Sequence, residues 1–66
     1  MLDKIDSDII IRSLYGDRAM SLKQFWIIEN KIDKQEDRDL LSRMLFTYPK
    51  PTLDQTNEFL KRNTLS

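Results

Sequence analysis

An amphipathic stretch in the first half of the chain, residues 21–32, constrains the fold more than any other part of the sequence. Ser21 and Gln24 have the spacing of a capping box, in which each side chain bonds the backbone amide of the other residue at a helix start. On a helical wheel the apolar side chains of this stretch fall within about 160° of one another. They are Leu22, Phe25, Trp26, Ile28 and Ile32. A face this broad needs partner helices, and we expect the indole of Trp26 to lie at the centre of the core.

The segment before this stretch also has the apolar spacing of a helix, with a candidate cap at each end. Asp3, Asp6 and Ser7 can each cap its start, and Gly16 stands where a residue in the left-handed conformation often ends a helix. The run Ile9–Ile11 leaves a short strand as an alternative, because β-branched residues favour strands. The apolar residues spread almost all round the wheel, which indicates either a central helix or a helix with one face against a second molecule.

Residues 33–39 are entirely polar and separate the stretch from a third apolar segment. The apolar positions between Leu40 and Tyr48 are displaced by about 110° from the earlier face on a continuous wheel, so one straight helix could not bury both. We therefore predict a turn and a new helix start, with Asp33 or Asp37 as the cap.

Two prolines, at positions 49 and 51, end this third helix, because a proline disfavours helical geometry in the residue before it. Thr52 and Gln55 then have the spacing of a second capping box and begin a fourth helix.

These patterns predict an all-α fold, a compact bundle of three to four short helices at about residues 4–15, 21–33, 37–47 and 52–62. A single domain would span residues 1–63 and be followed by a frayed tail at residues 64–66. The chain has 66 residues and neither cysteine nor histidine, so disulfides and ordinary zinc sites cannot support its small core. Self-association or a protein partner is therefore expected.

The composition excludes most catalytic chemistry. Without histidine or cysteine the commonest bases and nucleophiles are missing, and one glycine cannot form a phosphate-binding loop. Asp33, Gln35, Asp37 and Asp39 have the spacing of the first ligands of a calcium loop, but its later glycine and glutamate positions hold Arg38 and Met44. We expect no enzyme activity, no cofactor and no metal. Glu29, which falls on the apolar face, would pair with Arg12, Arg18 or Arg43 at the rim, or else be a buried functional carboxylate.

Two classes of function remain. The first is a small helical protein-protein interaction module, acting as a regulator, inhibitor or accessory subunit of a larger protein, or as a homodimer. Surplus apolar residues on several faces favour it, and we predict partner contacts through Ile10, Ile11, Ile27 and Phe46.

The alternative is a small nucleic-acid-binding protein, built like a helix-turn-helix module, whose basic C-terminal part touches phosphates. Its candidate contacts are Arg43, Lys50, Lys61 and Arg62. Eleven basic and eleven acidic residues give a net charge of zero, which argues against it. The longest apolar run has four residues, so we expect a cytoplasmic protein with no membrane contact.

Overall fold

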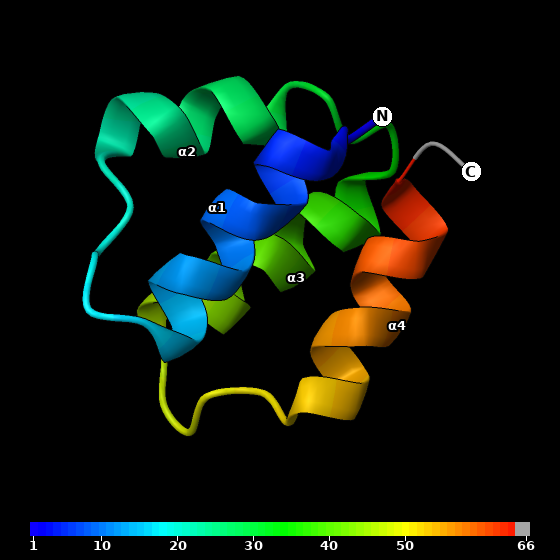
Figure 1. Ribbon diagram of the computed structural model, residues 1–66. Coiled ribbons are helices and arrows are strands. Elements are labelled where there is room, and N and C mark those ends of the chain that lie inside the picture. The colour runs from blue at the N-terminus through cyan, green and yellow to red at the C-terminus, as the bar shows by residue number, and fades with distance from the viewer. Residues whose placement is uncertain (65–66) are drawn as a thin grey trace.

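The computed structural model describes residues 1–64 and shows four helices packed around one core (Figure 1). They are α1 (Lys4–Tyr15), α2 (Leu22–Glu29), α3 (Gln35–Phe46) and α4 (Leu53–Asn63). In this part of the chain the regular structure besides the helices is one isolated parallel bridge between Leu2 and Thr64. The predicted all-α bundle is confirmed, and the run Ile9–Ile11 lies within α1 rather than in a strand.

Three of the four helices begin at a side-chain cap. Thr52 and Gln55 form both bonds of the predicted capping box at the start of α4. The Ser21 hydroxyl accepts a bond from the amide of Gln24 at the start of α2, although the return bond of that box is not recorded. Asp3 caps α1 by accepting from the amide of Asp6, whose carboxylate accepts from the amide of Asp3 in return.

The predicted start of α3 was wrong. Its N-cap is Lys34, which makes no side-chain capping bond, and the helix begins two residues before Asp37. Asp37 cannot act as the cap because it already lies in the first helical turn, where its buried carboxylate accepts a bond from Arg62 of α4. An acid in this turn still favours the helix, since it faces the positive end of the helix dipole.

Helix α2 ends at Glu29, four residues before the predicted end. The amides of Lys31 and Ile32 bond the carbonyl groups three residues back, of Ile28 and Glu29, and this tightens the chain into a turn. The turn keeps Ile32 in the core and brings Lys31 beside α1.

The core takes two apolar residues from each helix, one from the segment before α1 and one from the turn after α2. Its buried members are Leu2, Ile10, Leu14, Phe25, Ile28, Ile32, Leu41, Met44, Phe59 and Leu60. Trp26 is not among them, and its predicted central place in the core was wrong, because 55% of the residue is exposed. The broad apolar arc of α2 is divided: Phe25, Ile28 and Ile32 point inward, while Leu22 and Trp26 lie on the edge that faces solvent.

The end of α1 is fixed to the loop between α3 and α4. Lys50 donates from Nζ to the carbonyl of Leu14 at 2.9 Å, where a cation also compensates the negative end of the helix dipole. The Tyr15 hydroxyl lies 3.0 Å from the carbonyl oxygen of Pro51, to which it donates, and 2.7 Å from the hydroxyl of Thr56. These bonds join segments that are more than thirty residues apart in the sequence.

Gly16 ends α1 with φ −105° and ψ −169°, so the predicted left-handed conformation was wrong. Glycine is needed for a different reason: a Cβ atom at this position would lie 2.6 Å from the carbonyl oxygen of Arg12.

The two ends of the described chain lie side by side (Figure 1). The amide of Leu2 donates to the carbonyl of Asn63 at 2.8 Å, and Leu2 is fully buried. The predicted fraying therefore does not begin at Thr64, which pairs with Leu2. Leu65 and Ser66, the rest of the predicted tail, lie outside the described residues.

Candidate functional site

The structure separates the four predicted partner residues into two pairs. Ile10 is fully buried, so its predicted role as a partner contact was wrong; it lies on the inward stripe of α1 between Asp6 and Leu14. Ile11 is half-buried against the same core. Ile27 and Phe46 are exposed, as a partner contact requires. The difference follows from helix geometry, because neighbouring residues project about 100° apart and only one of three consecutive isoleucines can point straight inward.

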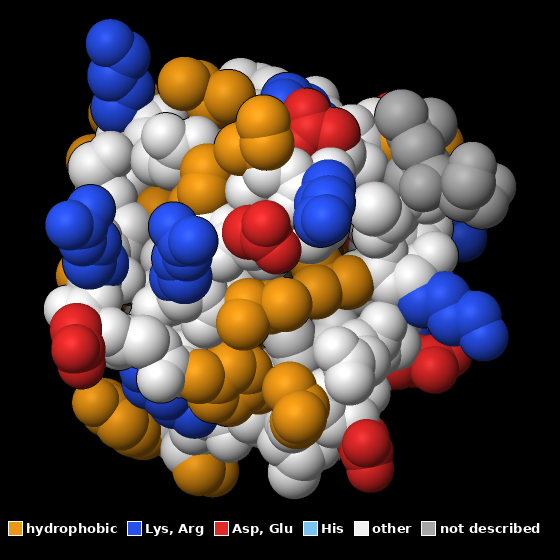
Figure 2. Space-filling model, viewed as in Figure 1, with side chains coloured by type: hydrophobic (Ala, Val, Ile, Leu, Met, Phe, Trp, Pro, Cys, Tyr) orange, Lys and Arg blue, Asp and Glu red, His pale blue; other side chains and the backbone are white. Residues whose placement is uncertain are grey.

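Ile27 and Phe46 belong to a larger exposed surface on and beside α2, which we call the α2 apolar face. It comprises Leu22 (56% exposed), Trp26 (55%), Ile27 (44%) and Phe46 (56%). Leu22 and Trp26 are four residues apart and therefore neighbours on one side of the helix. Figure 2 shows hydrophobic side chains exposed over α2 and over α1 on this side of the molecule. Sequence reasoning missed Leu22 and Trp26, although an arc of 160° is wider than the stripe of roughly 100° that a core contact needs.

An aromatic contact connects Phe46 to α2. The rings of Phe25 and Phe46 lie 5.2 Å apart between centroids at an interplanar angle of 77°, an edge-to-face arrangement. Such pairs contribute about 0.5–1.5 kcal/mol beyond area burial. Because Phe25 is buried and Phe46 is not, the contact holds the Phe46 ring in place at the surface, next to the turn of α2 that carries Leu22.

A second surface feature is a groove of about 450 Å³ between α3 and α4, which we call the α3–α4 groove. Leu40 and Met44 of α3, with Pro51 of the loop, supply its apolar lining, and Asp54, Gln55, Glu58 and Arg62 of α4 supply its polar lining. A shallower hollow that shares Leu40, Met44 and Pro51 continues from it to Arg43 and Lys50. The patterns considered in the sequence did not indicate this groove, because it forms between segments whose relative placement the sequence does not specify.

Of the four basic residues of the nucleic-acid alternative, Arg62 has an ion-pair partner within residues 1–64, and Arg43, Lys50 and Lys61 are exposed without one. Arg62 Nη2 lies 3.1 Å from Asp37 Oδ1, so a buried carboxylate offsets its charge. Lys50 donates to a carbonyl of α1, and together with Arg43 it lines the hollow beside the α3–α4 groove.

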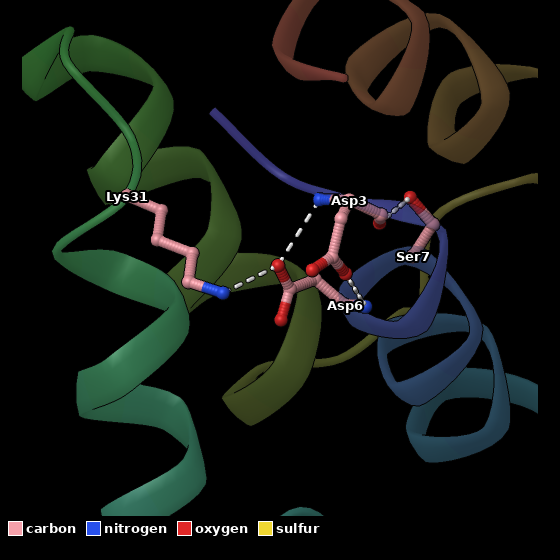
Figure 3. Close-up of polar contacts among 4 residues, drawn as sticks. All are labelled: Asp3, Asp6, Ser7 and Lys31. Atoms are coloured by element: carbon pink, nitrogen blue, oxygen red, sulfur yellow. Dashed lines mark hydrogen bonds and ion pairs between the residues drawn. The ribbon is translucent and has the colours of Figure 1, made fainter. Parts of the chain in front are cut away.

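The clearest cluster of titratable groups joins the start of α1 to the turn after α2 (Figure 3). Asp6 is buried, and its Oδ2 accepts from Lys31 Nζ at 2.8 Å and from the amide of Asp3 at 3.1 Å. Burial alone would raise the pKa of Asp6, but the bonds and charge of Lys31 and the bonds from Asp3 together hold that pKa below its ordinary value of 3.8. The bond to Asp6 raises the pKa of Lys31 in turn.

This arrangement makes Asp6 a structural carboxylate. A carboxylate that is ionised and accepts two hydrogen bonds has no proton to donate, and a lowered pKa makes it a weaker base. Its observed role is to fix the turn after α2 against α1.

Glu29 is half-buried near the end of α2. The ion pairs found within residues 1–64 do not include it, so the predicted pair with Arg12, Arg18 or Arg43 is not formed.

Within the described part of the chain, no group of three or more acidic, histidine or cysteine side chains could hold a metal ion. None of the helices found between residues 1 and 64 has the length and apolar character needed to cross a membrane. Comparison of the chain with protein-family models, with curated proteins and with solved structures gave no match.

Proposed function

We propose that this chain is a protein-protein interaction module, which acts as a regulator, inhibitor or accessory subunit by binding another protein chain through the α2 apolar face. The observation that carries the proposal is that Leu22, Trp26, Ile27 and Phe46 are 44–56% exposed around one short helix. Leu22 and Trp26 are neighbours on the helix surface, exposed apolar patches are typical of protein contact sites, and aromatic residues such as Trp26 often supply most of the binding energy.

The preformed shape of the surface also supports this role. Ser21 caps the start of α2, Lys31 fixes the turn after its end, and Phe25 holds Phe46. A surface that is already ordered loses less conformational entropy when it binds. The nucleic-acid alternative has less support, because Asp37 offsets the charge of Arg62 and the net charge of the chain is zero.

Affinity capture from the native host tests the proposal with three forms of the chain. The first is the natural sequence, the second carries Leu22→Ser and Trp26→Ser, and the third carries Ile5→Ser and Leu53→Ser. Ile5 and Leu53 are exposed apolar residues of α1 and α4, so the third form controls for a general loss of surface hydrophobicity. We expect a partner that the first and third forms retain and the second form loses.

Sedimentation at two protein concentrations tests the case in which the partner is a second copy. A mass that rises with concentration, and stays monomeric for the Leu22→Ser, Trp26→Ser form, would identify a homodimer through this face. Equal capture by all three forms, together with a constant monomer mass, would contradict the proposed function.

A further inference from the structure

The α3–α4 groove shares no residue with the α2 apolar face. One of its walls is apolar and the other is polar. Leu40 and Met44 are four residues apart and present one apolar edge of α3. The opposite wall is one side of α4, with the spacing i, i+1, i+4 and i+8: Asp54, Gln55, Glu58 and Arg62. The residues that α4 buries lie on its other side: Thr56, Phe59, Leu60 and Asn63. The groove is therefore a surface feature with an apolar floor and a polar wall, and it does not interrupt the core.

The charges of the polar wall do not cancel. Asp37 offsets the charge of Arg62 through an ion pair of 3.1 Å. Asp54 and Glu58 are exposed, and the ion pairs formed among residues 1–64 do not include either of them. The two carboxylates are one helical turn apart, so they present negative charge together along the same edge of the groove.

We propose that the α3–α4 groove binds an amphipathic helical segment of a partner protein, whose apolar side chains contact Leu40, Met44 and Pro51 and whose lysine or arginine residues pair with Asp54 and Glu58. An amphipathic helix in a groove between two helices is a common mode of peptide recognition. The volume of about 450 Å³ lies within the roughly 300–1,000 Å³ range of ligand pockets. Asp54 and Glu58 favour a basic segment along the α4 wall, because they would repel an acidic one, whereas Arg43 and Lys50 line the neighbouring hollow and not this wall.

The test uses a synthetic amphipathic helical peptide of leucine and lysine as the probe, with the leucine and glutamate peptide of the same apolar pattern as its control. Titration of the isotope-labelled full chain, followed by amide chemical shifts, reports both affinity and location. We expect the lysine peptide to move the amides of Leu40, Met44 and Glu58 most, and to bind more weakly as salt is raised. The glutamate peptide should leave these amides unchanged.

A pair of variants with equal net charge isolates the groove. Asp54→Asn with Glu58→Gln removes both carboxylates of the wall, whereas Asp8→Asn with Asp17→Asn removes two exposed carboxylates elsewhere. Because the groove variant loses two exposed ion pairs with the peptide, we expect it to bind the lysine peptide about two- to thirtyfold more weakly than the control variant. Both changes keep the size of the side chains, and circular dichroism checks that both variants are folded.

Three outcomes would overturn the proposal: equal affinity of the two variants, equal binding of the two peptides, or shifts that centre on Leu22 and Trp26 instead of the groove. None of these outcomes depends on capture of a partner through the α2 apolar face, so failure here and failure of the proposed function can be told apart.

Discussion

Helices α2 and α4 each bury two large apolar side chains in the core, but they contain different numbers of apolar residues. In α2 five of eight residues are large and apolar, and two of them are buried. In α4 three of eleven residues are large and apolar, and Phe59 and Leu60 are buried. Each helix therefore gives the core two large apolar side chains, and the surplus of α2 lies at the surface. This comparison shows that α2 carries three large apolar residues more than it buries, whereas α4 carries one, Leu53.

The comparison is tested most strongly by removing an aromatic side chain from each helix. The loss in the free energy of unfolding should be larger for α4 than for α2. Phe59 is fully buried, so Phe59→Ala should lower the free energy of unfolding by about 3–5 kcal/mol. Domains of this size seldom obtain more than about 3–5 kcal/mol from one core, so we expect this variant to be largely unfolded. Denaturant titration followed by circular dichroism measures the effect. A cooperative transition at the natural midpoint would show that Phe59 does not support the core.

The helix caps give a second contrast. Thr52 takes part in both bonds of its capping box, while Ser21 makes one bond. Both caps should matter, since loss of such a cap costs about 0.5–2 kcal/mol, but we expect Thr52→Ala to lower the free energy of unfolding more than Ser21→Ala does. Denaturant titration of the two variants under the same conditions decides the order. The reverse order would mean that the return bond from Gln55 adds nothing.

Acid should weaken the ion pair between Asp6 and Lys31, which fixes the turn after α2 to α1. The pKa of Asp6 in the folded chain lies below its ordinary value of 3.8, so ionised Asp6 stabilises the fold above that value. The contribution is lost as pH falls through the lowered pKa, because the carboxylate then takes up a proton and releases Lys31. NMR titration of the Asp6 carboxyl carbon should give a midpoint below 3.8.

The matched variant Asp6→Asn removes the titrating group while keeping the size of the side chain. When the pH is lowered from 5 through the pKa of Asp6, the free energy of unfolding of this variant should fall less than that of the natural chain. An unchanged acid response would show that other carboxylates account for the loss of stability.

The smallest effect on folding is expected at Trp26. Because 55% of this residue is exposed, Trp26→Ala should change the free energy of unfolding by about 1 kcal/mol or less, even though it removes the largest side chain of the chain. Trp26 is the single tryptophan, so its fluorescence reports directly on its surroundings. Emission at the long wavelength of a solvated indole and ready quenching by iodide are expected. A loss of stability close to that of Phe59→Ala would place the indole in the core.

Local signals in the sequence were sufficient for the helices. The cap at Thr52 and the prolines at positions 49 and 51 predicted the start of α4 and the end of α3 within one or two residues. These signals succeed because a cap or a proline acts on the backbone of its immediate neighbours. The end of α2 was predicted less well, since Lys31 is turned toward α1 by an ion pair with Asp6, twenty-five residues earlier.

The surfaces were harder to predict than the helices. The helical wheel identified the apolar arc of α2 but could not tell which half of the arc faces the core, so Trp26 was placed inside. The same limit applied to Ile10, which belongs to the inward stripe of α1. Pairing of Arg62 with Asp37 and the groove beside Asp54 depend on how α3 and α4 lie in space, which no local pattern encodes.

The bond between Leu2 and Asn63 has a consequence for synthesis on the ribosome. Leu2 precedes all four helices, yet the backbone that it pairs with lies at the end of α4 and is made after the other three. A chain released up to the end of α3 would still lack Phe59 and Leu60 and would leave Leu2 uncovered. The bundle can therefore complete its core only after α4 has left the exit tunnel.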